Sequence, residues 1–358
     1  MPFRIKVSLW ILAFLATMAL LGPFLIPVPP LTGLRPAREL AWPGSAWVAV
    51  GGLQVHVEAV ADGVVLQPSA GADLLAPADL PGAGERPAFL LLHGFGANTR
   101  SWGATLPWLS GDALAVAYDR PAFGLTDRPL GRWTAAANPY GPAAQVATAV
   151  GVLDALAVER AVLVGHSAGG VIALQTALAH PDRVAGLVLV GATVYAGGGA
   201  PAWSRPLLRT PQLERIGPLI VRQLGGPQGD QFLRASWADP TRLDDATFAA
   251  YRRALQVEGW DRALWELVKA SAEPDLVPFL ASVRVPVLVV TGAQDAIVPP
   301  DQSRDLARDL VDAAGGATLV ELDGCGHLPH EECPEAFRAA LEAWLADAAP
   351  LPGAGRRP

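Results

Sequence analysis

The stretch Val162-Leu-Val-Gly-His-Ser-Ala-Gly-Gly-Val-Ile-Ala-Leu174 decides the fold that this chain of 358 residues is expected to adopt. Its pattern predicts a buried strand that ends at Gly165 and a helix that begins after Ser167. A Gly-x-Ser-x-Gly pentapeptide in this context raises its serine hydroxyl on a tight bend between strand and helix. Glycine is needed at Gly165 and Gly169, because a side chain at either position would collide with neighbouring backbone. We therefore interpret Ser167 as a candidate nucleophile; the alternative is a buried serine that only forms a turn.

Apolar runs on both sides of this stretch predict further strands that are buried on both faces. Helical stretches such as Gly141–Leu156 and Gly169–Ala179 lie between several of them, which is the βαβ pattern of a mainly parallel sheet. An antiparallel hairpin is expected over Trp47–Glu58, with its turn at Gly51-Gly52. The fold class is therefore α/β, with a mainly parallel central sheet and helices on both faces. The predicted buried strands lie at residues 88–93, 114–118, 161–164, 186–190, 287–290 and 317–322.

The strand pattern stops between Tyr195 and Pro274, where apolar residues recur at helical spacing instead. A helical block that joins two strands of such a sheet more often acts as a lid over a site than as decoration. It divides the core into two parts. We assign residues 196–276 to a helical cap or lid, 31–195 and 277–349 to the core, 62–87 to a surface-loop insertion rich in Ala, Gly and Pro, and 350–358 to a tail.

Residues 1–30 are assigned to a membrane anchor or signal segment. Residues 7–26 form an uncharged, mostly apolar run of about 20 residues, which is the length that spans one bilayer. The run ends in Pro27-Val-Pro-Pro30 without a small-x-small cleavage site, which favours an uncleaved anchor over a signal peptide. Basic residues before the run favour a cytoplasmic N-terminus, although others that follow it weaken this bias. We expect an extracytoplasmic catalytic part anchored by residues 7–26; secretion after signal cleavage is the alternative.

Composition excludes several classes of function. The formal net charge is −7, and Lys6 and Lys269 are the only lysines, so no basic surface is expected to bind nucleic acid. No cluster of His, Cys, Asp or Glu has metal-ligand spacing, and no Walker-type loop or Gly-x-Gly-x-x-Gly turn indicates a nucleotide cofactor. The two cysteines are Cys325 and Cys333. We expect two free, buried thiols, because closing so short a loop is geometrically demanding; a disulfide is the alternative.

A serine nucleophile needs a base, and the base needs an orienting acid. Asp295 lies in the loop after the strand that follows the cap, and His327 lies in a glycine-flanked loop after the last strand. The chain order Ser, Asp, His follows, so Ser167, Asp295 and His327 are the predicted catalytic triad. Asp323 and His330 are the nearby competitors. Asp323 could shape its loop, and His330 could pack against the helix that follows.

The turn His93-Gly-Phe-Gly96 supplies the second half of a predicted oxyanion hole. Its glycines let the backbone turn N–H groups inward, and the N–H groups of Phe95 and Ala168 are the predicted donors. His166 adjoins the nucleophile on a strained bend and is interpreted as structural. The histidines without a partner pattern, which are assigned to surface or core roles, are His56 and His180. The aromatic residues predicted to line an apolar substrate pocket are Trp102, Phe123, Trp203 and Trp237.

These motifs resemble those of the α/β-hydrolase superfamily, in particular its cap-bearing members that act on small molecules. The resemblance covers residues 47–345 and implies the α/β-hydrolase fold with its triad, while it leaves the substrate open. Ser167 differs from the aspartate nucleophile of the haloalkane dehalogenases and epoxide hydrolases in this superfamily. The membrane segment and the insertion at 62–87 depart from most soluble members. The resemblance is carried by His93-Gly-Phe-Gly96, Tyr118-Asp-Arg-Pro-Ala-Phe-Gly-Leu-Thr-Asp-Arg-Pro129, Gly165-His-Ser-Ala-Gly169, Gly292-Ala-Gln-Asp295 and Gly324-Cys-Gly-His327.

The predicted reaction is transfer of an acyl group to water. His327 takes the Ser167 proton as Oγ attacks a carbonyl, Asp295 steadies the imidazolium, and the backbone amides hold the oxyanion. The expected partners are a small-molecule ester with an apolar or lipid-like part and the membrane, with no nucleic acid, cofactor or metal. A carbon–carbon bond hydrolase or a perhydrolase with the same triad is one alternative. A noncatalytic, membrane-anchored binding protein on this fold is the other.

Overall fold

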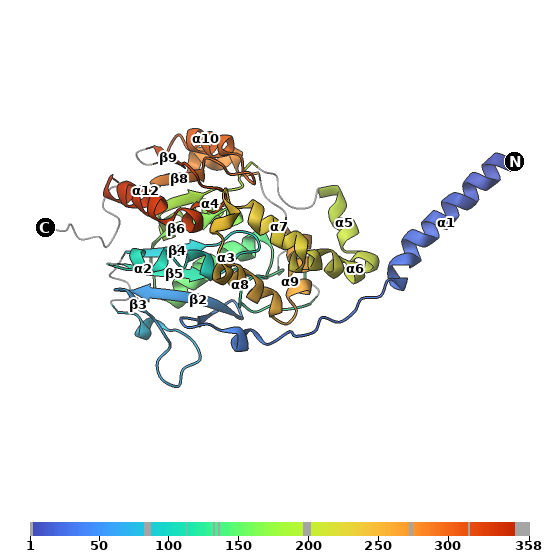
Figure 1. The fold of residues 1–358 in the computed structure, drawn as a ribbon, viewed down its shortest axis with the longest axis horizontal. Helices are drawn as coiled ribbons and strands as arrows, with labels where there is room; N and C mark the ends of the chain where they lie inside the picture. The colour runs from blue at the N-terminus through green and yellow to red at the C-terminus, as the bar shows by residue number, and fades with distance from the viewer. Residues whose placement is uncertain are drawn as a thin grey trace.

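The structure is a computed structural model that describes residues 3–81, 87–111, 113–131, 133–134, 137–195, 202–271, 275–313 and 316–347. Its strands are Ala46–Val50 (β1), Leu53–Ala61 (β2), Val64–Val65 (β3), Ala88–Leu92 (β4), Leu114–Tyr118 (β5), Ala161–His166 (β6), Val184–Val190 (β7), Val287–Gly292 (β8) and Ala317–Leu322 (β9). They form one sheet in the order β1-β2-β5-β4-β6-β7-β8-β9, and the short β3 pairs with β2 (Figure 1). From β5 to β9 the neighbouring strands run parallel, whereas β1, β2 and β3 pair antiparallel.

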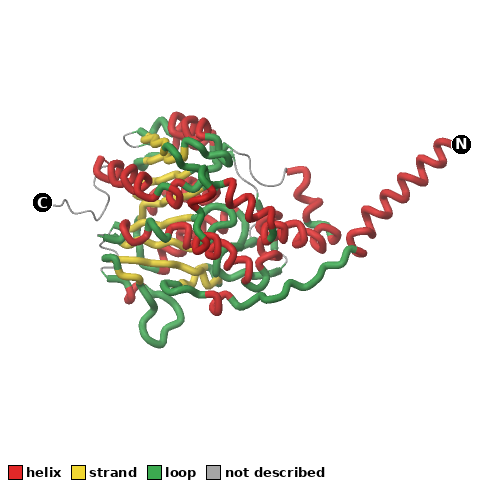
Figure 2. Tube along the Cα trace, in the orientation of Figure 1, coloured by secondary structure: helices red, strands yellow, loops and turns green. Residues whose placement is uncertain are grey.

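Helices cover both faces of the sheet, because its central strands bury side chains in both directions (Figure 2). Within β4, Leu90 and Leu92 belong to one apolar core, and Phe89 and Leu91 belong to the other. This division follows the two-residue repeat of a strand. The first core is completed by α3 (Pro142–Ala155), α4 (Ala168–Ala179) and α10 (Pro300–Asp309), and the second by α2 (Leu106–Leu109) and α12 (Pro334–Asp347). The predicted α/β class, with a mainly parallel sheet between two helical layers, is confirmed.

The described helices between β7 and β8 form a cap over loops that follow the parallel strands. Phe123, from the loop after β5, shares an apolar cluster with Trp260 and Leu264 of the cap. The cap helices are α5 (Arg205–Leu208), α6 (Pro211–Val221), α7 (Pro227–Ala235), α8 (Asp245–Arg253) and α9 (Trp260–Ala270). Parts of the predicted segments lie outside the described residues, namely 196–201 and 272–274 of the cap, 82–86 of the loop insertion and the tail at 350–358.

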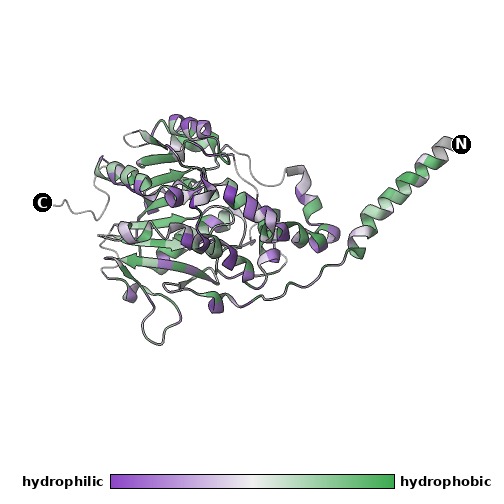
Figure 3. Cartoon of the chain, in the orientation of Figure 1, coloured by the Kyte–Doolittle hydropathy of each residue, from purple (hydrophilic) through white to green (hydrophobic). Residues whose placement is uncertain are grey.

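The N-terminal helix α1 (Phe3–Leu25) projects from the end of the molecule that carries α5 and α6, and it is apolar along most of its length (Figure 3). Its stretch Val7–Leu25 has a mean hydropathy of 2.0 and is not buried against the rest of the chain. By length and composition this stretch can cross a membrane. Near its end, Nε2 of Gln212 in α6 donates a hydrogen bond to the carbonyl oxygen of Leu20 at 3.1 Å. The C-terminal end of α1 therefore contacts the cap.

The buried carboxylate of Asp119, which follows β5, fixes the loops beneath the cap. Its Oδ1 accepts the N–H of Thr99 at 2.7 Å, and its Oδ2 accepts the N–H of Leu125 at 2.7 Å. The same Oδ2 lies 2.7 Å from Nδ1 of His56, whose Nε2 lies 2.9 Å from Oγ of Ser45. The sequence offered no partner for His56, because Ser45 and Asp119 reach it only through the pairing of β2 with β1 and β5.

Asp119→Ala should lower the free energy of unfolding by about 3–5 kcal/mol, because it leaves buried hydrogen-bond donors without their acceptor. Urea unfolding of the full-length chain in detergent micelles, followed by tryptophan fluorescence, measures this change. Asp301→Ala, at an exposed ion pair with Arg304, is the control and should stay within about 0.5 kcal/mol of the wild type. Equal losses in the two variants would contradict the role assigned to Asp119.

Candidate active site

Ser167 stands between β6 and α4 with φ +52° and ψ −122°, a conformation that residues with side chains rarely adopt. Close packing at two glycines permits this bend. A Cβ at Gly165 would lie 2.6 Å from the carbonyl oxygen of Gly169, and a Cβ at Gly169 would lie 2.2 Å from that of Leu92. The N–H of Ser167 donates to the carbonyl oxygen of Val190 at 2.8 Å, which ties the bend to β7. Ser167 therefore occupies the sharp strand-to-helix turn expected from the sequence.

Asp295 and His327 come together from the loops after β8 and β9. Nδ1 of His327 lies 2.8 Å from Oδ2 of Asp295, and the other carboxylate oxygen accepts two backbone N–H groups at 2.8 Å each. The two loops approach closely because residue 292 is glycine. A Cβ at Gly292 would lie 2.1 Å from the carbonyl oxygen of Gly326. This arrangement fixes the imidazole through Nδ1 and leaves Nε2 for a second partner.

Ser167 and His327 line the same cavity of about 130 Å³, which lies between the core and the cap. Its walls are mostly apolar. From the cap they include Leu224, Phe232, Leu233, Leu255, Trp260 and Leu264. Among the described residues, no three His, Cys, Asp or Glu side chains are grouped so that they could hold a metal ion. The cavity therefore combines a serine, a histidine and an apolar wall.

The two residues predicted for the oxyanion hole both adjoin the serine. Ala168 is the first residue of α4, where backbone N–H groups have no acceptor within the helix and the helix dipole attracts negative charge. Phe95 lines the cavity and follows Gly94. A Cβ at Gly94 would lie 3.1 Å from Cβ of Ser167 and 2.7 Å from Nδ1 of His166. The backbone before Phe95 thus approaches the serine as closely as only glycine permits.

One of the four aromatic residues predicted for the pocket lines the cavity, namely Phe123. The prediction was wrong for the other three. Trp102 is fully buried in the core, where its ring stacks on that of His330 with 4.2 Å between centroids. Trp237 packs beside the cavity wall, in an apolar cluster with Leu233 and Leu328, and Trp203 is 76% exposed. Residue type alone does not reveal whether a ring packs into the core, into the cap or outward, and this explains the error.

Neither competitor is placed to replace a member of the predicted triad. Asp323 is exposed, whereas burial lowers the pKa of His330 to about 3 and keeps this ring neutral. Burial also lowers the pKa of His166 well below its ordinary value. Nε2 of His166 donates to the carbonyl oxygen of His327 at 2.9 Å, and its ring centroid lies 4.7 Å from that of His327. A neutral His166 therefore holds the backbone of His327 without adding a second cation beside it.

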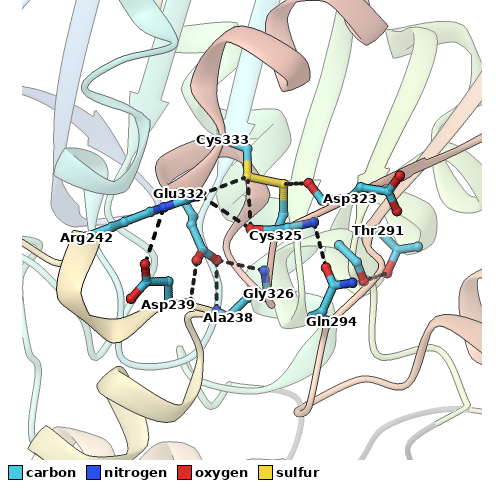
Figure 4. Close-up of a disulfide and its surroundings, with 12 residues drawn as sticks. Ala238, Asp239, Arg242, Thr291, Gln294, Asp323, Cys325, Gly326, Glu332 and Cys333 are labelled. Carbon is cyan, nitrogen blue, oxygen red and sulfur yellow. Dashed lines mark hydrogen bonds and ion pairs between the residues drawn. A yellow bond between two sulfur atoms is a disulfide. The ribbon is translucent and has the colours of Figure 1, made fainter.

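Cys325 and Cys333 form a disulfide that encloses His327 (Figure 4). The prediction of two free thiols was wrong. After His327 the chain folds back into the one-turn helix α11 (Pro329–Glu332), so the two Cα atoms lie 6.1 Å apart, within the usual range for a disulfide. Sequence spacing alone did not reveal this reversal of the chain.

Glu332 fastens the same loop to the cap (Figure 4). Its Oε2 accepts the N–H of Gly326 at 2.7 Å and the N–H of Ala238, from the cap, at 3.0 Å. The N–H of His327 in turn donates to the carbonyl oxygen of Ser236 in the cap at 2.8 Å. The position of the histidine loop is therefore set partly by the cap.

A second buried carboxyl group, that of Glu331, joins the cap to the core beside the cavity. Its Oε1 accepts the hydroxyl of Tyr251, from α8, at 2.5 Å, and it also accepts the hydroxyl of Ser101. Oγ of Ser101 lies 3.1 Å from Nε2 of His330. Burial raises the pKa of Glu331 to about 7. No sequence motif pointed to this cluster, because its members come from three segments that are far apart in the chain.

The chain is similar to known proteins over most of its length. Residues 89–340 match the Alpha/beta hydrolase family. The 3-oxoadipate enol-lactonase 2 of Acinetobacter baylyi is 26% identical over 263 residues, which cover 73% of this chain and 90% of that protein. The magnesium-chelatase 30 kDa subunit of Rhodobacter capsulatus is 32% identical over 275 residues, which cover 74% and 88%. A thermophilic esterase of Thermogutta terrifontis shares the fold, with a TM-score of 0.61 and 22% identity over 85% of this chain and 97% of its own.

The buried Glu331 should make stability depend on pH. Between about pH 4.5 and about pH 7 the folded chain keeps the Glu331 proton while the unfolded chain loses it, so this group lowers the free energy of unfolding as pH rises. Glu331→Gln removes the titration. The free energy of unfolding of Glu331→Gln, relative to that of the wild type, should therefore rise by up to about 3 kcal/mol when the pH is raised from about 5 to about 8.

Urea unfolding at these two pH values measures the difference. Glu335→Gln, at an exposed position in α12, is the matched control and should follow the wild type at both values. A constant difference between Glu331→Gln and the wild type would show that Glu331 is ionised in the folded chain at both pH values.

Proposed function

This chain belongs to the alpha/beta hydrolase family, and we propose that it is a serine hydrolase that cleaves carboxylic esters. One observation carries the proposal. Ser167, on a bend with positive φ, lines the same cavity as His327, and Nδ1 of His327 lies 2.8 Å from Asp295. A nucleophile, a base and an orienting acid are the three parts that acyl transfer to water needs. The likeness to an enol-lactonase adds support, since a lactone is a cyclic ester.

The proposed reaction begins when Oγ of Ser167 attacks the ester carbonyl carbon and His327 takes the hydroxyl proton through Nε2. Asp295 holds Nδ1 and stabilises the imidazolium that forms. The N–H groups of Phe95 and Ala168 stabilise the oxyanion of the tetrahedral intermediate. His327 then protonates the departing alcohol and, in the second half, activates the water that hydrolyses the acyl-enzyme.

The cavity favours a small apolar substrate. A dry cavity of about 150 Å³ lined by aliphatic and aromatic side chains accepts a molecule of the size of benzene. The cavity of about 130 Å³ next to Ser167 is of this order, and its walls are mostly apolar. We therefore propose esters with a short or aromatic acyl or alcohol group, whereas a longer, lipid-like chain requires the cap to open.

A noncatalytic binding role is the competing proposal, because the magnesium-chelatase subunit that this chain resembles is not named for a hydrolytic activity. The strained backbone at Ser167 disfavours this alternative. Residues in such conformations persist where the surrounding structure holds them, and they cluster at active sites. Carbon–carbon bond hydrolysis and perhydrolysis use the same three residues, and assays with a diketone or with peroxide separate them from ester cleavage.

We also propose that α1 anchors the chain in a membrane, with the catalytic part outside the cytoplasm. The support is the length and hydropathy of Val7–Leu25, together with its lack of burial against the chain. The disulfide between Cys325 and Cys333 adds a second argument, because disulfides persist in oxidising compartments. Removal of α1 as a signal sequence would instead release the catalytic part, and this is the alternative.

Ser167→Ala should abolish labelling by a fluorophosphonate probe and reduce turnover of p-nitrophenyl esters by roughly 10,000-fold or more, because it removes the nucleophile. The control is Ser45→Ala. Ser45 lies against His56, which pairs with Asp119 in a second Ser–His–Asp set, but it does not line the cavity. Labelling should survive in this control. Labelling that survives in Ser167→Ala and disappears in Ser45→Ala would reverse the assignment.

The full-length chain should remain in the membrane fraction after extraction with alkaline carbonate, because the apolar stretch satisfies its backbone hydrogen bonds within a helix. A chain that begins near Leu31 should be soluble and should cleave the same esters, since the proposed site lies beyond the anchor. Mass spectrometry of the intact chain completes the test. A mature N-terminus just after Pro30 would show that residues 1–30 are a cleaved signal.

A further inference from the structure

A second cavity lies beside the C-terminal end of α1, apart from the site described above. It has a volume of about 1000 Å³ and lies between the end of α1 and the helices α6 and α9 of the cap. Phe24 and Val28 line it from the N-terminal segment, Arg215 lines it from α6, and Arg262 and Trp265 line it from α9. We name it the anchor groove, because α1 and the cap build it together.

Positive charge gathers around the anchor groove, although the whole chain carries a net charge of −7. Two of its basic residues, Lys269 and Arg222, are neutralised by carboxylates at 2.5–2.8 Å. The other three, Arg209, Arg215 and Arg262, are exposed and form no ion pair within the part of the chain that the structure describes. Three guanidinium groups at the groove therefore have no carboxylate partner among the described residues, while Glu214 and Glu266, which also line it, both pair with Lys269.

Two indole rings, those of Trp133 and Trp265, also line the groove. Their N–H groups are buried within the protein, and Trp265 is only 4% exposed, so these rings contribute packed walls to the groove. Phe24, Val28 and Leu130 add apolar surface to the same walls. Cationic donors beside apolar side chains fit an anion that carries an apolar tail.

The contacts of α1 set the depth of the groove relative to a membrane. The carbonyl oxygen of Leu20 accepts a hydrogen bond from Gln212, and that of Ile26 accepts one from Arg215, both at 3.1 Å. The start of α6 is thus held beside the last turns of α1, at the end of the molecule from which α1 projects (Figure 1). In a bilayer spanned by Val7–Leu25, the groove lies at the level of the lipid headgroups.

We propose that the anchor groove binds the phosphate headgroup of an anionic phospholipid from the bilayer that holds α1. The guanidinium groups of Arg209, Arg215 and Arg262 receive the phosphate oxygens. Apolar side chains at the C-terminal end of α1 contact the first carbons of the acyl chains. This inference rests on the proposed membrane anchoring and is independent of the proposed ester cleavage.

Helix α9 connects the anchor groove with the active-site cavity. Trp260 and Leu264 line the cavity, whereas Arg262, Trp265 and Lys269 line the groove. Residues four apart share one face of a helix, so α9 presents different faces to the two cavities. A bound headgroup therefore holds a wall of the cavity at the membrane surface, where apolar esters accumulate.

Native mass spectrometry of the full-length chain released from detergent micelles tests this proposal. Phosphatidylglycerol and phosphatidylcholine of equal chain length are the probes, and we expect about tenfold more retained phosphatidylglycerol. Combining Arg209→Gln with Arg262→Gln should reduce retained phosphatidylglycerol about tenfold, because it removes two phosphate contacts. Combining Arg308→Gln with Arg338→Gln is the charge-matched control. Both of these arginines are exposed on core helices, and the control should retain the wild-type amount.

Equal retention of the two lipids by the wild type, or unchanged retention after the change at Arg209 and Arg262, would overturn the proposal. Millimolar inorganic phosphate should leave the lipid bound; displacement would identify a site for free phosphate instead. The intact mass in the same spectrum reports whether residues 1–30 are attached, and their absence would refute the anchoring on which the inference rests. Ester hydrolysis by the same preparation tests the proposed catalysis separately.

Discussion

Backbone packed directly on backbone, at positions where a Cβ cannot fit, is the constraint on which the candidate active site depends. A Cβ at Gly169 would come within 2.2 Å of the carbonyl oxygen of Leu92, and one at Gly292 would come within 2.1 Å of that of Gly326. The first contact seats the bend of the serine against β4. The second brings the loops after β8 and β9 together. Ser167 and His327 therefore line one cavity, and Asp295 reaches His327, because the main chain beneath them is packed as closely as glycine allows.

The parts of this structure that sequence could predict are those encoded within a few consecutive residues. Continuous apolar runs located the central strands, and the pattern around Ser167 predicted the bend that the structure contains. Side-chain environments that depend on distant segments were missed. The Glu331 cluster combines three segments, and the disulfide depends on a chain reversal after His327. Trp203 shows the same limit, because residue type did not reveal that its helical segment turns the ring outward.

The loop that carries His327 is held by hydrogen bonds to both the core and the cap. The core holds it through the hydrogen bond from His166, while the cap holds it through Ser236 and through the Glu332 carboxylate. A shift of the cap relative to the sheet would therefore be transmitted to the imidazole as well as to the cavity walls. Burial of apolar side chains alone would not have this effect, because apolar contacts have no strong directional preference.

The disulfide between Cys325 and Cys333 also restricts the conformations of the unfolded chain. The two cysteines are eight residues apart, and closing a loop of this size removes about 2–3 kcal/mol of conformational freedom from the unfolded ensemble. The segment around His327 then reaches its native conformation from a restricted set of shapes. Because this segment follows β1 to β9 in the sequence, it is synthesised after the sheet that receives it. An oxidised ring would dock onto that sheet with a smaller loss of entropy than an open loop.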